Sequence, residues 1–100
     1  METNFEGEAM KLFEIYDHFK KDAEWCNENM KECINQLVDA EALLTRVSLW
    51  EHSPLQDVTC ITLNMKIQRL YDLIQKLFDR EGANIVGMKW VMDMLSMMVG

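Results

Sequence analysis

The amino-acid sequence predicts an all-α fold, a long coiled-coil-like antiparallel helical hairpin. Three observations predict it: the apolar residues recur at spacings of four and three, the chain contains one proline, and two segments of nearly equal length flank that proline. A repeat that averages 3.5 residues is typical of a helix packed along its length against another helix. One hundred residues suffice for one domain, so residues 1–100 are expected to form a single helical unit.

The first helix is expected over residues 4–51. Neither Gly nor Pro occurs between Glu8 and Ser53 to interrupt it. Its apolar ladder comprises Phe5, Ala9, Leu12, Tyr16, Phe19, Ala23, Cys26, Met30, Cys33, Leu37, Ala40, Leu44 and Val47.

The turn is expected at residues 52–53, because the following residues have the composition of a helix start. Ser53 is suited to cap the next helix, Pro54 to occupy its first position, and Gln56 follows three residues after the cap. The second arm therefore begins at Pro54 and runs towards Val99. Two arms of similar length joined by a tight turn indicate an antiparallel hairpin.

The second arm is expected in two parts, residues 54–81 and 84–99, with a break near Gly82. The ladder continues through Cys60, Leu63, Ile67, Leu70, Ile74 and Leu77. It is then interrupted by polar and small residues, among which Gly82 is suited to end a helix and Asn84 to begin one. Folding the chain about the turn places Ala23 opposite Gly82, so that small residues face each other. A kink instead of a break, and a compact three-helix bundle in which residues 85–99 fold back, are the alternatives.

The net charge of −7 lies entirely in the first half of the chain. Residues 1–53 contain twelve Asp and Glu against five Lys and Arg, whereas residues 54–100 contain five of each. The acidic side chains of the first helix fall on its outer positions: Glu14, Asp17, Glu24, Glu28, Glu32 and Asp39. Such a face argues against nucleic-acid binding, which requires positive charge. It is typical of a solvated face, with a docking strip for a basic partner as the alternative.

The chain is expected to have no catalytic, metal or cofactor site, and so not to be an enzyme. Its two histidines, His18 and His52, stand apart from any nucleophile, and no phosphate-binding or zinc-binding motif is present. Cys26 and Cys33 lie about 10 Å apart along one helix, too far for a disulfide. Free thiols favour a reducing compartment, and no secretory signal is visible, so an intracellular protein, cytoplasmic or nuclear, is expected.

The last part of the chain is unusually apolar. Eleven of the fifteen residues from Ile85 to Val99 are apolar, five of them methionine, but the run is too short to span a bilayer and contains Lys89 and Asp93. No membrane insertion is therefore expected. Only Lys89, Asp93 and Ser96 form a polar stripe, so nearly the whole circumference of this helix requires a cover. The apolar run at the end of the sequence also suggests a domain cut from a longer protein.

The apolar surface of residues 85–99 is larger than one neighbouring helix covers. It predicts a partner-binding surface at the open end of the hairpin, where the first helix is also broadly apolar. The expected contact residues are Phe5, Leu12, Phe13, Tyr16, Phe19, Met88, Trp90, Val91, Met92 and Leu95. An apolar patch of this size is either an interaction site or an aggregation liability. Two hairpins would meet there as a homodimer, or a partner helix would fill the groove; ordinary core filling in a monomeric bundle is the alternative.

Four further residues are secondary candidates for partner binding: Trp25, Trp50, Ile61 and Met65. Leu49 and Trp50, with Val58, Ile61 and Met65, are expected to plug the tip of the hairpin, or Trp50 anchors a partner. Trp25 falls on an outer position where nothing in the hairpin is expected to cover it.

The sequence therefore favours a non-enzymatic oligomerisation or adaptor module that mediates protein–protein interaction in an intracellular assembly. The alternative is a monomeric regulatory bundle whose methionine-rich groove captures an amphipathic helix of a signalling or transcription partner.

Overall fold

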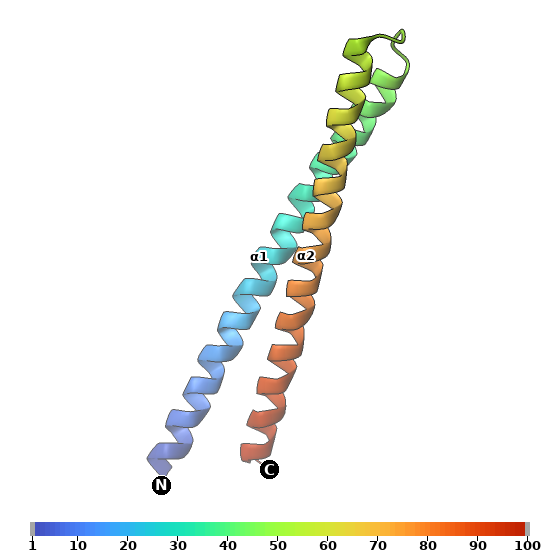
Figure 1. The fold of residues 1–100 in the computed structure, drawn as a ribbon. Coiled ribbons are helices and arrows are strands. Elements are labelled where there is room, and N and C mark those ends of the chain that lie inside the picture. The colour runs from blue at the N-terminus through green and yellow to red at the C-terminus, as the bar shows by residue number, and fades with distance from the viewer. Residues whose placement is uncertain (1, 100) are drawn as a thin grey trace. The chain divides into compact units, whose positions relative to one another are not determined.

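The protein is an all-α helical hairpin in the computed structural model, which describes the backbone of residues 2–99 and the side chains of residues 5–99. Helix α1 spans Glu2–Ser48 and helix α2 spans Pro54–Val99 (Figure 1). No strand occurs among the described residues. The predicted fold class is confirmed, and so are both ends of the second arm. The first helix ends three residues earlier than predicted.

The chain divides into two compact units, and each contains a segment of both helices. Unit 1 comprises the residues up to Asn27 together with those from Phe78 onwards, and unit 2 comprises Glu28–Leu77. The single domain predicted for residues 1–100 stays a prediction.

The turn in unit 2 is held by Ser53 and Gln56, the two residues that predicted it. The backbone N–H of Gln56 donates to Ser53 Oγ at 3.1 Å, which confirms Ser53 as the N-cap of α2. Gln56 Nε2 donates in the other direction, to the carbonyl oxygens of Val47 at 3.2 Å and of Trp50 at 3.0 Å. One side chain therefore satisfies carbonyls that the end of α1 leaves free. This cap ends α1 at Ser48, so the turn is longer than the predicted two residues.

The core of unit 2 is the predicted ladder of both arms. Its buried members are Met30, Cys33, Leu37, Ala40, Val47, Leu63, Leu70 and Leu77. Beside this ladder, the hydroxyl of Tyr71 donates a hydrogen bond to Glu41 Oε1 at 2.9 Å. This bond connects α2 to α1 on one flank of the unit. Unit 2 thus pairs its helices through an apolar seam with a polar contact beside it.

The core of unit 1 continues the ladder, but it includes polar residues. Cys26 and Val91 are fully buried, and Asn84 is the buried polar residue of the described core. Leu12, Tyr16, Phe19, Met88 and Leu95 are half-buried around them. Residues 85–99 are the end of α2 rather than a separate third helix, so the three-helix alternative is wrong.

The predicted break near Gly82 is wrong, because α2 is one helix from Pro54 to Val99. No described residue of the chain has a positive φ, so Gly82 does not end a helix. The apparent interruption arises because Glu81 and Asn84 occupy the two ladder positions after Leu77, at spacings of four and three. Asn84 is buried there and bonds to Asp22, so a polar layer replaces the expected gap.

The predicted pairing of Ala23 with Gly82 is also wrong. A Cβ atom at Gly82 would meet nothing within 4 Å, and Gly82 and Ala83 are both exposed. The close approach occurs instead at Gly87, where a Cβ atom would lie 2.7 Å from Cζ of Phe19. The large ring on α1 therefore requires the small residue on α2.

We expect Gly82→Ala and Gly87→Ala to change the free energy of unfolding by different amounts, although both replace a glycine within a helix. Alanine favours a helix interior by about 1 kcal/mol over glycine, so Gly82→Ala is expected to stabilise the chain by about that amount. At Gly87 the new methyl group displaces the Phe19 ring, which offsets the gain. Urea denaturation of both variants measures the difference. Equal stabilisation by the two substitutions would contradict the close packing of Phe19 on Gly87.

The three cysteines are free thiols: Cys26 and Cys33 are buried and Cys60 is half-buried. Burial raises the pKa of the Cys26 thiol, with Asp22 contributing in the same direction. A thiol held neutral in this way packs as a small apolar side chain.

Candidate protein-binding surface

One flank of unit 1 carries a row of exposed apolar side chains, which we call the apolar stripe: Phe13, Phe78, Ile85, Met92 and Val99. Four of these residues lie on α2 at intervals of seven, so they align along one side of the helix beside its buried ladder. Phe13 lies on α1 on the same flank. Their exposed fractions range from 51% for Met92 to 83% for Val99. The stripe is a second apolar seam that the chain does not itself cover.

Two shallow grooves between α1 and α2 join the stripe to the core of unit 1. In the first groove, Phe13 of α1 faces Met92, Leu95, Ser96 and Val99 of α2. The second groove lies on the same flank, nearer to Asn27, and its lining consists of Lys20, Ala23, Glu24, Asn27, Glu81, Ile85 and Met88. The stripe therefore borders two separate grooves on the same flank of unit 1, and ridges of another helix pack into grooves of this kind.

The second groove contains an unsatisfied polar atom. Glu81 Oε2 is buried and has no hydrogen-bond partner among the described residues. Buried carboxylate oxygens are normally paired, because an unpaired one loses its hydration without compensation. Glu81 Oε2 is therefore an exception among the described buried polar atoms.

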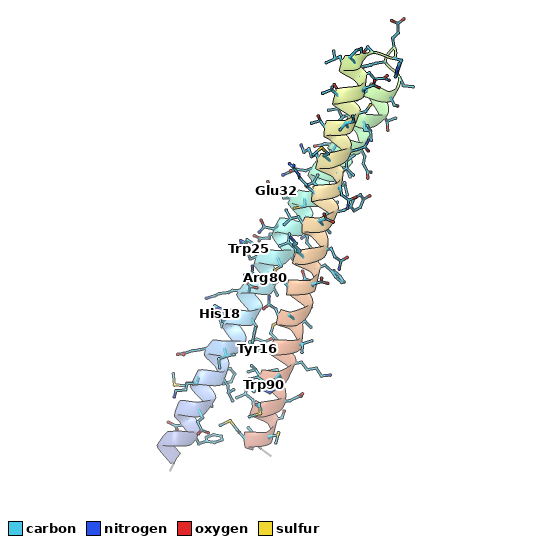
Figure 2. All side chains as sticks on the ribbon, in the orientation of Figure 1. Tyr16, His18, Trp25, Glu32, Arg80 and Trp90 are labelled. Carbon is cyan, nitrogen blue, oxygen red and sulfur yellow. The ribbon has the colours of Figure 1, made fainter. Side chains whose placement is uncertain are left out.

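A polar network around Asp22 lies on the opposite flank of unit 1. Arg80 Nε donates to Asp22 Oδ2 at 2.8 Å, Arg80 Nη2 bonds to Asp22 Oδ1, and Asn84 Nδ2 donates to Asp22 Oδ2. The Arg80 guanidinium also lies 4.9 Å from the centroid of the Trp25 ring (Figure 2). Trp25 is exposed, as predicted, but the expectation that nothing in the hairpin covers it is wrong, because Arg80 lies over its ring. The part of this flank around Asp22 is therefore occupied by contacts within the chain.

The network is expected to make the protein sensitive to acid. Hydrogen bonds from Arg80 and then Asn84 lower the pKa of Asp22 from its usual 3.8. A carboxylate whose pKa is lower in the folded state stabilises that state above the unfolded pKa and loses this contribution as the pH falls. Thermal midpoints measured from pH 7 to 2.5 should therefore fall more steeply below pH 3.8 in the wild type than in Asp22→Asn. Parallel curves would show that the network contributes nothing.

The predicted contact residues divide into three groups in the structure. Val91 has no exposed surface and belongs to the chain's own core. Five others are half-buried between the helices: Leu12, Tyr16, Phe19, Met88 and Leu95. Four are exposed: Phe5, Phe13, Trp90 and Met92. The structure brings Phe13 and Met92 together on the stripe, whereas the prediction omitted Phe78, Ile85 and Val99. The signal that identifies them is that Phe78, Ile85, Met92 and Val99 follow one another at intervals of seven.

The secondary candidates near the turn are exposed. The predicted plug at the tip of the hairpin is wrong, because Leu49 is 82% exposed and Trp50, Val58, Ile61 and Met65 are also exposed. The longer turn and the cap by Gln56 hold the tip together without them. Trp50, Ile61 and Met65 stay candidates for partner binding.

The outer face of α1 is acidic and exposed at Glu14, Asp17, Glu24, Glu28, Glu32 and Asp39. Lys21 pairs with Asp17 at 2.9 Å, and a hydrogen bond from Lys21 lowers the pKa of the Asp17 carboxyl. This arrangement fits a solvated helix face.

Neither described helix has a stretch long and apolar enough to cross a membrane. The described side chains include no cluster of three or more His, Cys, Asp or Glu suited to a metal ion. No family model matches the sequence, and no curated protein or solved structure shows significant similarity to it.

Proposed function

We propose that the chain is a non-enzymatic oligomerisation or adaptor module, in which the apolar stripe of unit 1 receives one or more helices of a protein partner. The observation that supports this proposal most directly is the spacing of Phe78, Ile85, Met92 and Val99, four exposed apolar residues at intervals of seven. A helix with apolar residues on its ladder and on one flanking position has the pattern of a helix in the core of a bundle. Within this chain only the ladder residues pack against the other helix, and the flanking apolar residues stay exposed.

The chemistry of the surface favours a protein partner. The stripe is apolar, and the neighbouring face of α1 is acidic, so a phosphate backbone would be repelled. Asn84 is the buried polar residue of the described core, and it bonds to Asp22 across the helix pair. This bond supports a structural role for the Asn84 side chain. The free thiols of Cys26 and Cys33 support an intracellular setting, cytoplasmic or nuclear.

A second candidate function is that of a monomeric regulatory bundle that captures an amphipathic helix from a signalling or transcription partner. The observation that favours it is a methionine-containing groove on the other flank of unit 1, in which Met94 and Met98 of α2 face Glu8, Lys11 and Leu12 of α1. Methionine side chains adapt to differently shaped partner helices.

Site-specific photo-crosslinking in living cells tests the proposed function. A photoreactive residue at position 85 of the stripe is expected to give a discrete protein adduct that disappears when Met92→Asp is added. The matched control is position 21 on the outer face of α1, where no adduct is expected, since Lys21 makes only an exposed ion pair. The absence of any adduct at position 85, or equal adducts at both positions, would overturn the proposal.

A further inference from the structure

We infer that the occupant of the apolar stripe is a second copy of this chain, so that two copies bury their stripes against each other as a four-helix bundle. This inference rests on the proposed function and names the partner of the same surface. It is carried by the pattern of apolar residues on α2 and by the charges beside the stripe.

The stripe side of α2 is uncharged except for one lysine. From Phe78 to Val99, the positions that face this side follow spacings of four and three: Phe78, Gly82, Ile85, Lys89, Met92, Ser96 and Val99. This is the same spacing as the buried ladder, so the side is able to pack into an equivalent side of another helix. In an isologous interface the same surface of both copies is in contact, so that surface must complement itself. An apolar row with this repeat is able to complement an identical row on the second copy.

The charges on this flank also complement one another between copies. Lys89 is exposed and forms no ion pair within the described part of the chain, while Asp17 and Glu24 lie on the same flank of α1. Packing α2 of one copy against α1 of the other brings the isolated cation towards an acidic helix face.

Two adjacent residues of α2 provide a matched pair of test variants. Ile85 lies on the stripe, whereas Val86 is also exposed but points away from both the ladder and the stripe. Ile85→Asp and Val86→Asp therefore introduce the same charge into the same turn of helix, and only the first lies in the proposed interface.

Sedimentation equilibrium of the purified full chain, at concentrations from micromolar to hundreds of micromolar, tests the inference. The wild type is expected at twice 11.8 kDa, or 23.6 kDa. Ile85→Asp and Met92→Asp are expected at 11.8 kDa with their helical circular dichroism retained at low temperature, and Val86→Asp at 23.6 kDa. A wild type that is monomeric throughout overturns the inference. So does a dimer that both stripe variants leave intact, because its interface then lies elsewhere.

The two proposals fail in distinguishable ways. If the purified chain is monomeric but position 85 still crosslinks in cells to a different protein, the stripe binds a partner and the second copy is the wrong occupant. If the adduct at position 85 has the mass of two copies, both proposals are supported. If the chain is monomeric and position 85 gives no adduct, both are overturned.

Discussion

An aspartate at position 91 is expected to unfold unit 1, whereas an aspartate at position 92 is expected to leave the unit folded. Val91 has no exposed surface, so Val91→Asp places a carboxylate in the core without a partner. The expected loss is about 3–5 kcal/mol, which is comparable to the loss caused by an unpaired buried charge. Met92 is half exposed on the stripe, and its replacement projects into solvent in a single copy.

Circular dichroism at low temperature measures this difference directly. Unit 1 contributes residues 2–27 of α1 and 78–99 of α2, about half of all helical residues. Loss of about half the helical signal is therefore expected for Val91→Asp, because cooperative units unfold separately when one is destabilised. The full signal is expected for Met92→Asp. A helical signal that is equal in both variants would contradict the placement of Val91 in the core and Met92 outside it.

The comparison between Val91 and Met92 also separates folding from binding. Met92→Asp is expected to remove partner binding while the helices persist, so its effect is on the stripe. Val91 was predicted as a contact residue because it is apolar and lies in the same run as Met92. Apolarity alone does not distinguish a residue that packs within the chain from one that packs against another chain. The position within the heptad does, since Val91 lies on the ladder and Met92 beside it.

The sequence was sufficient to predict the helices, their antiparallel order and the start of α2. Local signals determine these features: the ladder needs only apolar spacing, and the cap needs only Ser53, Pro54 and Gln56. The residue at which α1 ends was harder to predict from the sequence. Gln56 contacts the carbonyls of Val47 and Trp50 through a side chain that lies across the turn, so the position of Ser48 as the last helical residue depends on a tertiary contact.

The polar layer of unit 1 was the feature that sequence patterns predicted least well. Glu81, Gly82 and Asn84 have the composition of a helix boundary, and local propensity alone favours a break there. The helix continues because Asp22 on α1 accepts hydrogen bonds from Arg80 and Asn84, which makes a polar residue tolerable on the ladder. Asp22 lies about sixty residues away in sequence. Pairing of this kind becomes visible only when the register of the two helices is known.

The same layer leads to the second large expected effect, in which Asn84→Leu makes the protein more stable but less uniquely folded. Asn84 is the buried polar member of the described core, and its amide donates to Asp22 Oδ2. Leucine restores the apolar ladder, and burying its side chain is expected to contribute about 1.5–3 kcal/mol, while Asp22 keeps its hydrogen bond from Arg80. A buried asparagine in a helical seam, however, favours the one register in which its amide is bonded. Without the asparagine, other registers of the two helices and other assemblies no longer leave a buried amide unpaired, so they become closer in free energy to the native one.

Urea denaturation and sedimentation velocity together test this expectation. Asn84→Leu should raise the urea midpoint and broaden the distribution of sedimenting species relative to the wild type. Asn35→Leu, on an exposed position of α1, is the matched control and should change stability by no more than about 0.5 kcal/mol. A less stable Asn84→Leu protein would show that the amide contributes to stability. A more stable protein with one unchanged species would show that the register is set by other contacts, of which Phe19 against Gly87 is the nearest one in unit 1 with a comparable steric demand.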